Sequence, residues 1–123
     1  MMRTEKSFNL QIWVGLRSGY GEYIHPIEKV REICNKFVNT LDDRGLGDCV
    51  SITPTEFRYI NGWEPRVIVG YINYSRFPRT EEQILKKALA LGEILRVQLF
   101  QERITVVTPE TTYLLEDEQP KTH

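Results

Sequence analysis

Arginine and aromatic residues alternate in the segments of this sequence that are predicted as loops. Arg17 and Tyr20 flank a glycine-containing break, and Tyr59 and Trp63 lie on either side of a predicted turn. A guanidinium group matches phosphate oxygens with two parallel hydrogen bonds, and an aromatic face stacks on a purine base. The pattern therefore indicates a small ligand with phosphates and a base, although it also suits a surface that binds nothing. The ligand-binding candidates are Arg17, Tyr20, Arg58, Tyr59, Trp63, Arg66, Arg76, Phe77, Gln101 and Arg103.

Residues that could catalyse a reaction do not form a recognisable set. The two histidines, His25 and His123, have no evident catalytic partner. The acidic pairs Asp42-Asp43 and Glu81-Glu82 are adjacent in the chain, so their side chains diverge and make a poor acid–base pair. The glycines after the first predicted strand lack dinucleotide-binding or P-loop spacing. The sequence therefore predicts a non-catalytic binding protein without a catalytic residue or a cofactor.

The two cysteines do not indicate a metal site. Cys34 falls on the apolar stripe of a predicted helix, and Cys49 stands at the start of a predicted strand. Their spacing fits neither a C-x-x-C motif nor a Cys/His zinc motif. Because free cysteine packs as a small apolar residue, we expect two buried thiols and no bound metal.

The first half of the chain predicts a strand followed by a helix. Apolar and polar residues alternate from Phe8 to Leu16, which is typical of a half-buried strand. Pro26 suits the first turn of a helix. Apolar residues then recur at three- and four-residue steps as far as Leu41, before a segment that contains Gly45. A helix that begins near Pro26 and ends near Leu41 is expected.

The second half predicts a hairpin, a second helix and one or two strands. The parity of the apolar residues changes at Pro54, which indicates a bulge, and Asn61-Gly62 is a hairpin turn signal. Residues 67–74 form the third predicted strand. Thr80 and Gln83 have the spacing of a capping box before the second helix. Residues 103–108 form the fourth strand, and residues 111–115 fit a short fifth strand.

The element order βαββαβ predicts an α+β fold of the ferredoxin-like type, with two helices on one face of an antiparallel sheet. We expect a single domain over residues 1–115 and a polar C-terminal tail over residues 116–123. The uncovered face of the sheet carries Trp13, which indicates a homo-oligomer, a dimer or a hexamer. The expected core between helices and sheet consists of Leu10, Ile12, Val30, Phe37, Val69, Leu91 and Leu95.

Size and charge restrict the partners. The chain has 123 residues and a formal net charge of −1, whereas a protein that binds long nucleic acids usually has a basic surface. No apolar run approaches the roughly 20 residues that cross a membrane, and residues 1–7 do not read as a signal peptide. We therefore expect a cytoplasmic protein that binds neither a membrane nor a long nucleic acid.

Several short motifs resemble those of a known family. A strand that ends in Val14-Gly15-Leu16 leads to a glycine-containing loop, and Glu64 precedes a Val/Ile-rich strand. The second helix runs into Leu99-Phe100-Gln101-Glu102-Arg103-Ile104-Thr105-Val106. From about Phe8 to Val107 the chain resembles the small phage proteins of the Thoeris anti-defence sponge type.

The resemblance implies a function without chemistry. Proteins of that family form oligomers and trap cyclic ADP-ribose isomers or cyclic oligonucleotides at subunit interfaces. It thus implies a phage anti-defence protein that binds and sequesters a cyclic nucleotide immune signal in the host cytoplasm without cleaving it. Two alternatives remain. One is a small oligomeric ferredoxin-like enzyme that acts on a small substrate at the open sheet face. The other is an RRM-like RNA-binding module, although the third strand lacks the expected basic and aromatic pattern.

Overall fold

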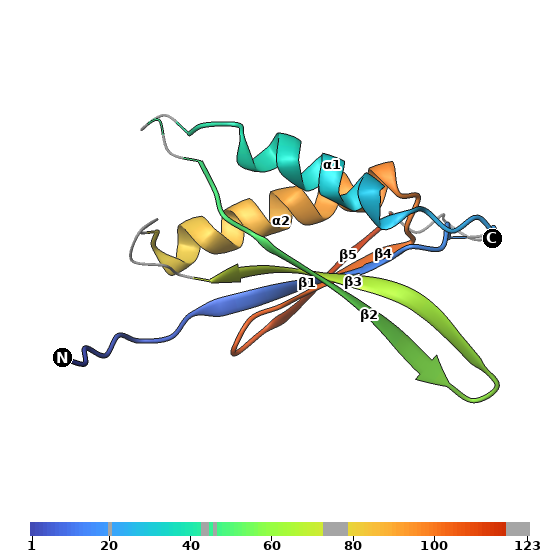
Figure 1. Cartoon of the computed structure of the whole chain (residues 1–123), viewed down its shortest axis with the longest axis horizontal. Helices are drawn as coiled ribbons and strands as arrows, with labels where there is room; N and C mark the ends of the chain where they lie inside the picture. Colours follow the sequence, from blue (N-terminus) through green and yellow to red (C-terminus); the bar gives the residue numbers. More distant parts are fainter. Residues whose placement is uncertain (20, 43–44, 46, 73–78, 118–123) are drawn as a thin grey trace, which may run out of the picture.

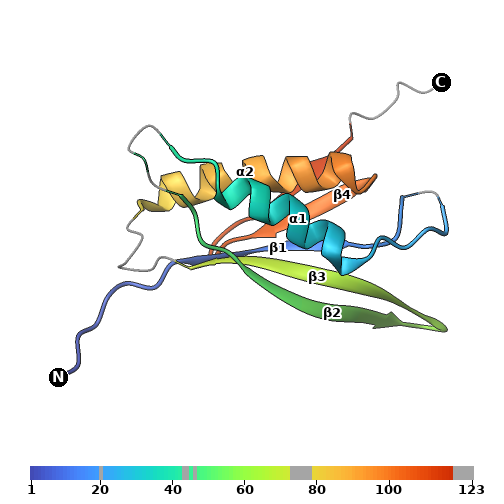
Figure 2. The ribbon, with the colours of Figure 1, turned by 45° about the horizontal axis from the view of Figure 1, so that its top comes forward.

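A computed structural model describes residues 1–19, 21–42, 45, 47–72 and 79–117. The elements are β1 (Asn9–Gly15), α1 (Ile27–Val38), β2 (Ser51–Tyr59), β3 (Gly62–Ile72), α2 (Glu81–Gln98), β4 (Arg103–Val107) and β5 (Thr112–Glu116). The strands form one sheet in the order β2-β3-β1-β4-β5, and every neighbouring pair is antiparallel. Both helices cover the same face of this sheet (Figures 1 and 2). The predicted α+β, ferredoxin-like fold is confirmed, with β5 added beside β4.

The core lies between the helices and the covered face of the sheet. Alternate residues of β1, namely Leu10, Ile12 and Val14, point toward the helices and are buried. Of the seven predicted core residues, only Phe37 differs, because its side chain packs at the edge of the core and is half-buried. Burial of apolar side chains in this layer holds the helices on the sheet and leaves the other face open.

Helix α1 ends three residues before the predicted end at Leu41. The backbone N–H of Asn39 donates to Asn35 O, and the N–H of Thr40 donates to Phe37 O at 3.1 Å. The Asn39 and Thr40 side chains also donate to carbonyls of the last turn. Because these contacts satisfy the terminal carbonyls, the helix stops there and Leu41 is 62% exposed. The prediction that Leu41 belongs to the buried stripe of the helix is therefore wrong.

The predicted bulge at Pro54 is also wrong, because β2 pairs with β3 in continuous register from Ser51↔Gly70 to Tyr59↔Gly62. β2 is an edge strand, where proline is tolerated if its nitrogen faces away from the neighbouring strand. The carbonyl of Pro65 accepts a hydrogen bond from Leu16 N on the β1 side, so the pair Glu56↔Pro65 is not hydrogen-bonded toward β2. By the alternation of an antiparallel ladder, the Pro54 nitrogen points outward from the sheet.

Two predicted turn and cap signals are confirmed. The hairpin between β2 and β3 lies at Asn61, which has a φ of 57° and therefore needs the left-handed conformation that asparagine tolerates. At the start of α2, the Thr80 side chain accepts from Gln83 N and the Gln83 side chain accepts from Thr80 N. This capping box fixes where α2 begins.

The structure also bears on the predictions for the cysteines, for the C-terminal limit of the domain and for membrane-spanning helices. Cys34 is buried, but Cys49 is exposed, because it lies in the segment before β2 and not within the ladder. β5 extends to Glu116, one residue past the predicted limit of the domain, and residues 118–123 lie outside the described residues. Neither helix that the structure describes is long and apolar enough to cross a membrane.

Candidate functional site

A polar cavity of about 580 Å³ lies at one end of the open face of the sheet. The strand register brings its walls together, because Gly15 pairs with Arg66, Phe57 pairs with Glu64, and Arg103 pairs with Glu116. Since side chains alternate between the two faces of a strand, these residues all face away from the helices. The residues that line it are Gly15, Arg17, Ser18, Gly19, Phe57, Glu64, Arg66, Gln101, Glu102, Arg103, Thr105, Glu116 and Asp117.

The loop after β1 and the turn after α2 close one end of the cavity, and Gln101 joins them. Gln101 Nε2 donates to Arg17 O at 2.7 Å and to Leu99 O at 3.0 Å, and the residue is 8% exposed. Gly19 N donates to Phe100 O at 2.7 Å. A Cβ atom at Gly15 would lie 2.5 Å from Gln101 Oε1, so only glycine leaves room for the amide. The cavity wall is therefore held by close packing and internal hydrogen bonds.

Glu64, Arg66 and Phe57 form the wall on the β2–β3 side. Arg66 Nε donates to Glu64 Oε1 at 2.8 Å, and Arg66 Nη2 donates to the same oxygen. The Arg66 guanidinium carbon lies 4.2 Å from the centre of the Phe57 ring, a cation–π contact. The Glu64 side chain is 19% exposed. This charged pair is partly withdrawn from water, where its interaction with a bound charge is stronger than at an exposed site.

The opposite wall is formed by β4, β5 and the residue that follows them. Arg103 Nε lies 3.1 Å from Glu116 Oε1. Asp117 is held at the rim by Arg96, a buried residue of α2 that also donates to Glu93. The hydrogen bonds with Glu93 and Asp117 raise the pKa of Arg96, and the bond with Arg96 lowers the pKa of Glu93. Arg96 therefore remains a cation that positions the Asp117 carboxylate.

The cavity carries charges of both signs, with three arginines and four carboxylates among the lining residues. Such a lining suits a ligand that has positive and negative groups of its own. It does not suit a ligand whose only charged groups are phosphates, since the carboxylates would repel them.

Four predicted site residues meet in this cavity, namely Arg17, Arg66, Gln101 and Arg103. Arg58, Tyr59 and Trp63 lie near the tip of the β2–β3 hairpin and are not among the lining residues. There Arg58 pairs with Glu56 at 2.9 Å and lies over the Trp63 ring at 5.9 Å. The remaining three candidates, Tyr20, Arg76 and Phe77, fall outside the described residues.

Sequence reasoning missed the acidic half of the cavity, above all Glu64, Glu102 and Glu116. The signal that could have found Glu64 is the alternation of side chains between the two faces of a strand. Glu64 and Arg66 are two apart on one strand, so they share a face, and the hairpin at Asn61 places Phe57 opposite Glu64. Glu116 could not be assigned to the cavity in this way, because its position depends on how β5 pairs with β4.

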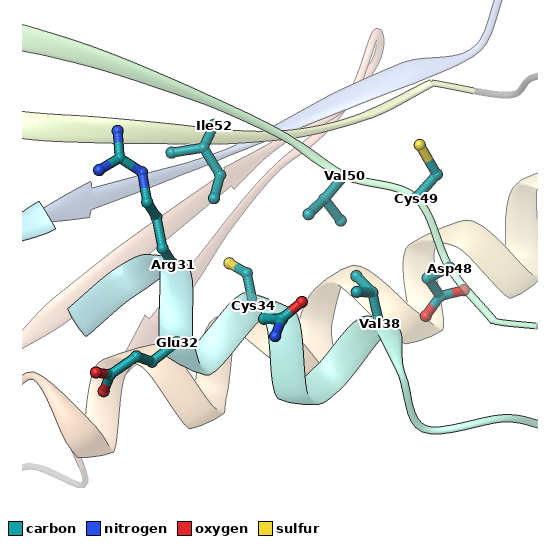
Figure 3. A pocket seen from close by; sticks show the side chains of 9 residues that line it. Arg31, Glu32, Cys34, Val38, Asp48, Cys49, Val50 and Ile52 are labelled. Carbon is teal, nitrogen blue, oxygen red and sulfur yellow. The ribbon is translucent and has the colours of Figure 1, made fainter. Parts of the chain in front are cut away.

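A second concavity of about 610 Å³ lies between α1 and the start of β2, and it is mainly apolar. Figure 3 shows Cys34 and Val38 of α1 facing Val50 and Ile52 across it. Burial raises the pKa of the Cys34 thiol to about 11, so it is a weak nucleophile at neutral pH. Although this groove is slightly larger, the polar cavity carries the groups that could bind and orient a charged substrate.

The sequence matches no family model and no curated protein. Two solved structures of a phage SAM lyase are similar to the chain over 98% of both chains. The lyase in complex with S-methyl-5'-thioadenosine has a TM-score of 0.72 and 21% sequence identity, and the apo state has a TM-score of 0.73 and 22% identity. The fold of this chain is therefore the fold of those small phage proteins.

This likeness contradicts three expectations from the sequence. Both neighbours are structures of a lyase, and one of them holds S-methyl-5'-thioadenosine, so the predicted sponge that traps a cyclic nucleotide signal is wrong, as are the predicted lack of catalysis and the predicted cyclic nucleotide partner. The mixed charge of the cavity gives the physical reason. Arginines alone suggested phosphate, but four carboxylates share their site. The alternative of a small enzyme that acts on a small substrate is favoured instead.

Proposed function

We propose that this protein is a lyase that cleaves S-adenosylmethionine (SAM) in the polar cavity. The observation that carries the proposal is the likeness, along 98% of both chains, to a phage SAM lyase with S-methyl-5'-thioadenosine bound. The mixed charge of the cavity supports it, because SAM has a sulfonium and an ammonium cation together with a carboxylate.

The relation between SAM and S-methyl-5'-thioadenosine defines the bond that breaks. S-methyl-5'-thioadenosine keeps the sulfur, the methyl group and the adenosine of SAM, so the bond between sulfur and Cγ of the amino-acid part is cleaved. The sulfur retains the electron pair and becomes a neutral thioether. The carboxylate of the substrate can supply the new pair to Cγ and close a five-membered lactone. No atom is added, and the ammonium group keeps the positive charge.

This reaction brings a carboxylate and a sulfonium together and removes both charges. A protein carboxylate beside the sulfonium would stabilise the substrate more than the transition state, and would slow the step. Glu64 therefore acts best at the ammonium group, with the oxygen that Arg66 does not use. By the same argument, Arg66 and Arg103, which line the cavity, would orient the substrate carboxylate through the oxygen that does not attack, since cations on the attacking oxygen would also slow the step.

The protein then accelerates cleavage mainly through geometry and exclusion of water. Well-oriented intramolecular reactions reach effective molarities of about 10⁵–10⁸ M. Phe57 and the packed Gly15–Gln101 wall replace water around the reacting atoms. The mechanism requires no histidine or cysteine in the cavity.

The test is incubation of the purified protein with SAM, followed by liquid chromatography and mass spectrometry at early times. We expect S-methyl-5'-thioadenosine and a four-carbon lactone in equal amounts. In H₂¹⁸O the lactone should carry no label, whereas hydrolysis at Cγ would give labelled homoserine. Recovery of intact SAM after prolonged incubation, or formation of S-adenosylhomocysteine by methyl transfer, would overturn the proposal.

A further inference from the structure

A hydrogen bond joins Ser18, in the wall of the polar cavity, to His25, which is not among the residues that line it. Ser18 Oγ lies 3.2 Å from His25 Nε2. Ser18 lines the polar cavity, whereas His25 lines a separate open groove together with Tyr23, Lys29 and Phe100. The Ser18 hydroxyl therefore stands between the cavity and a buried imidazole.

The imidazole is held in place from several sides. His25 is 7% exposed, and its backbone N–H donates to Leu16 O at 2.7 Å. The Tyr23 ring packs edge-on against it with 4.8 Å between ring centres, and the Phe100 ring stacks on it at 6.2 Å. Phe100 has a φ of 53° because it follows the C-cap residue of α2 in a Schellman cap, in which Phe100 N donates to Val97 O and Gln101 N donates to Arg96 O. His25 Nε2 thus remains directed at Ser18.

The same packing fixes the loop that carries Ser18. Arg17 and Ile24 form an antiparallel bridge, and Ser18 N donates to Tyr23 O at 2.9 Å. Gly19 N is bonded to Phe100 O. Rotation about the Ser18 side chain is therefore the remaining freedom at this point of the cavity wall, and the bond with His25 restricts it.

We propose that Ser18 contacts the ligand in the polar cavity, and that His25 is the positioning residue that sets whether the Ser18 hydroxyl accepts or donates. This inference rests on the function proposed above. A neutral imidazole with its proton on Nδ1 accepts the Ser18 proton, which leaves the Oγ lone pairs facing the cavity. An imidazolium donates from Nε2 instead, so Ser18 then presents its own proton to the cavity.

The first state suits an S-adenosyl compound, because its ammonium, amine and ribose hydroxyl groups all donate hydrogen bonds. Acid turns the Ser18 proton toward the cavity and adds a positive charge behind the wall, and both changes oppose a donor group of the ligand such as its ammonium. Among the described residues, the titratable groups that share the groove with His25 are Tyr23 of its own loop and Lys29 of α1. The side chains that α2 and the turn after it contribute to the groove, Val97, Gln98 and Phe100, do not titrate.

The experiment measures binding of S-adenosylhomocysteine and S-methyl-5'-thioadenosine by isothermal titration calorimetry at about pH 8 and about pH 5.5. S-adenosylhomocysteine is a thioether, so it is not cleaved during the titration. The variants are Ser18→Ala, Ser18→Thr and His25→Gln. Ser51→Ala is the matched control, because it makes the same change in β2 at a residue that does not line the cavity.

We expect the wild-type affinity for S-adenosylhomocysteine to fall about three- to tenfold on acidification, the usual effect of one hydrogen bond. Ser18→Ala should show the weaker affinity at both pH values, and Ser18→Thr should restore the pH dependence. His25→Gln, which does not titrate, should bind equally at both pH values. Ser51→Ala should behave as the wild type.

Equal affinity of Ser18→Ala and the wild type at about pH 8 would overturn this inference and leave the proposed function intact. Persistence of the pH dependence in His25→Gln would do the same. Failure of the wild-type protein to bind either probe would overturn the inference together with the proposed function. If Ser18→Ala does not fold, the comparison of Ser18→Thr with His25→Gln still decides the question.

Discussion

Substitution of Gly15 by alanine tests whether the wall of the cavity depends on one close contact. The new Cβ would lie 2.5 Å from Gln101 Oε1, a distance at which the amide has to move. Movement breaks the bonds from Gln101 Nε2 to Arg17 O and to Leu99 O. Each bond contributes about 0.5–1.5 kcal/mol net, so Gly15→Ala should lower the free energy of unfolding by about 1–3 kcal/mol.

Chemical denaturation followed by circular dichroism measures this loss, and two comparisons make it specific. Gly21→Ala is the matched control, since a Cβ there meets nothing nearer than 3.9 Å. In a Gln101→Ala background the obstructing amide is absent, so adding Gly15→Ala should cost little, or even stabilise by about 0.4–1 kcal/mol. A Gly15→Ala protein within about 0.5 kcal/mol of the wild type would refute the reasoning, as would equal costs in both backgrounds.

Four further predictions concern activity, stability and assembly. Glu64→Gln should lower kcat/KM for SAM about ten- to a hundredfold, mainly through KM, while the exposed Glu56→Gln leaves it unchanged. Arg103→Ala should weaken binding of S-adenosylhomocysteine about tenfold in calorimetry, and equal loss in Arg58→Ala would argue against the cavity. Phe37→Ala should cost about 1.5–3 kcal/mol in a denaturant titration, less than a fully buried phenylalanine, and a cost near zero would mean that α1 packs differently. The homo-oligomer expected from the aromatic residues of the open sheet face should appear in light scattering at tens of micromolar, and a clean monomer would dismiss it.

Local signals predicted the fold well because each one acts over a few residues. The alternation in β1, the capping box at Thr80 and the turn at Asn61 all lie where the sequence placed them. Pro54 misled the prediction because a change of parity suggests a bulge. In the structure β2 is an edge strand whose register with β3 stays continuous through this change of parity, and Phe57 lies on the open face of the sheet.

The candidate site was predicted only in part, because its residues come from separate segments that meet through the register of the sheet. Arg66 and Arg103 could be selected by type, since arginine often binds anions. Their carboxylate neighbours could not be assigned, because Glu116 reaches the cavity only through the pairing of β5 with β4. A set of arginines without its carboxylates suggested a phosphate ligand, and the resemblance of short motifs to the anti-defence sponges then supplied the class of function that the comparison contradicts.

The outward-facing nitrogen of Pro54 has a consequence for contacts between molecules. The outer side of β2 is an open edge nine residues long, where a strand from another molecule could extend the sheet. Pro54 stands in its middle and offers no N–H there, so an incoming strand would lose a central hydrogen bond and could not continue the ladder. Pro54 thus discourages the edge-to-edge pairing of strands that leads to aggregation. It favours assembly through the faces of the molecule over assembly through this edge.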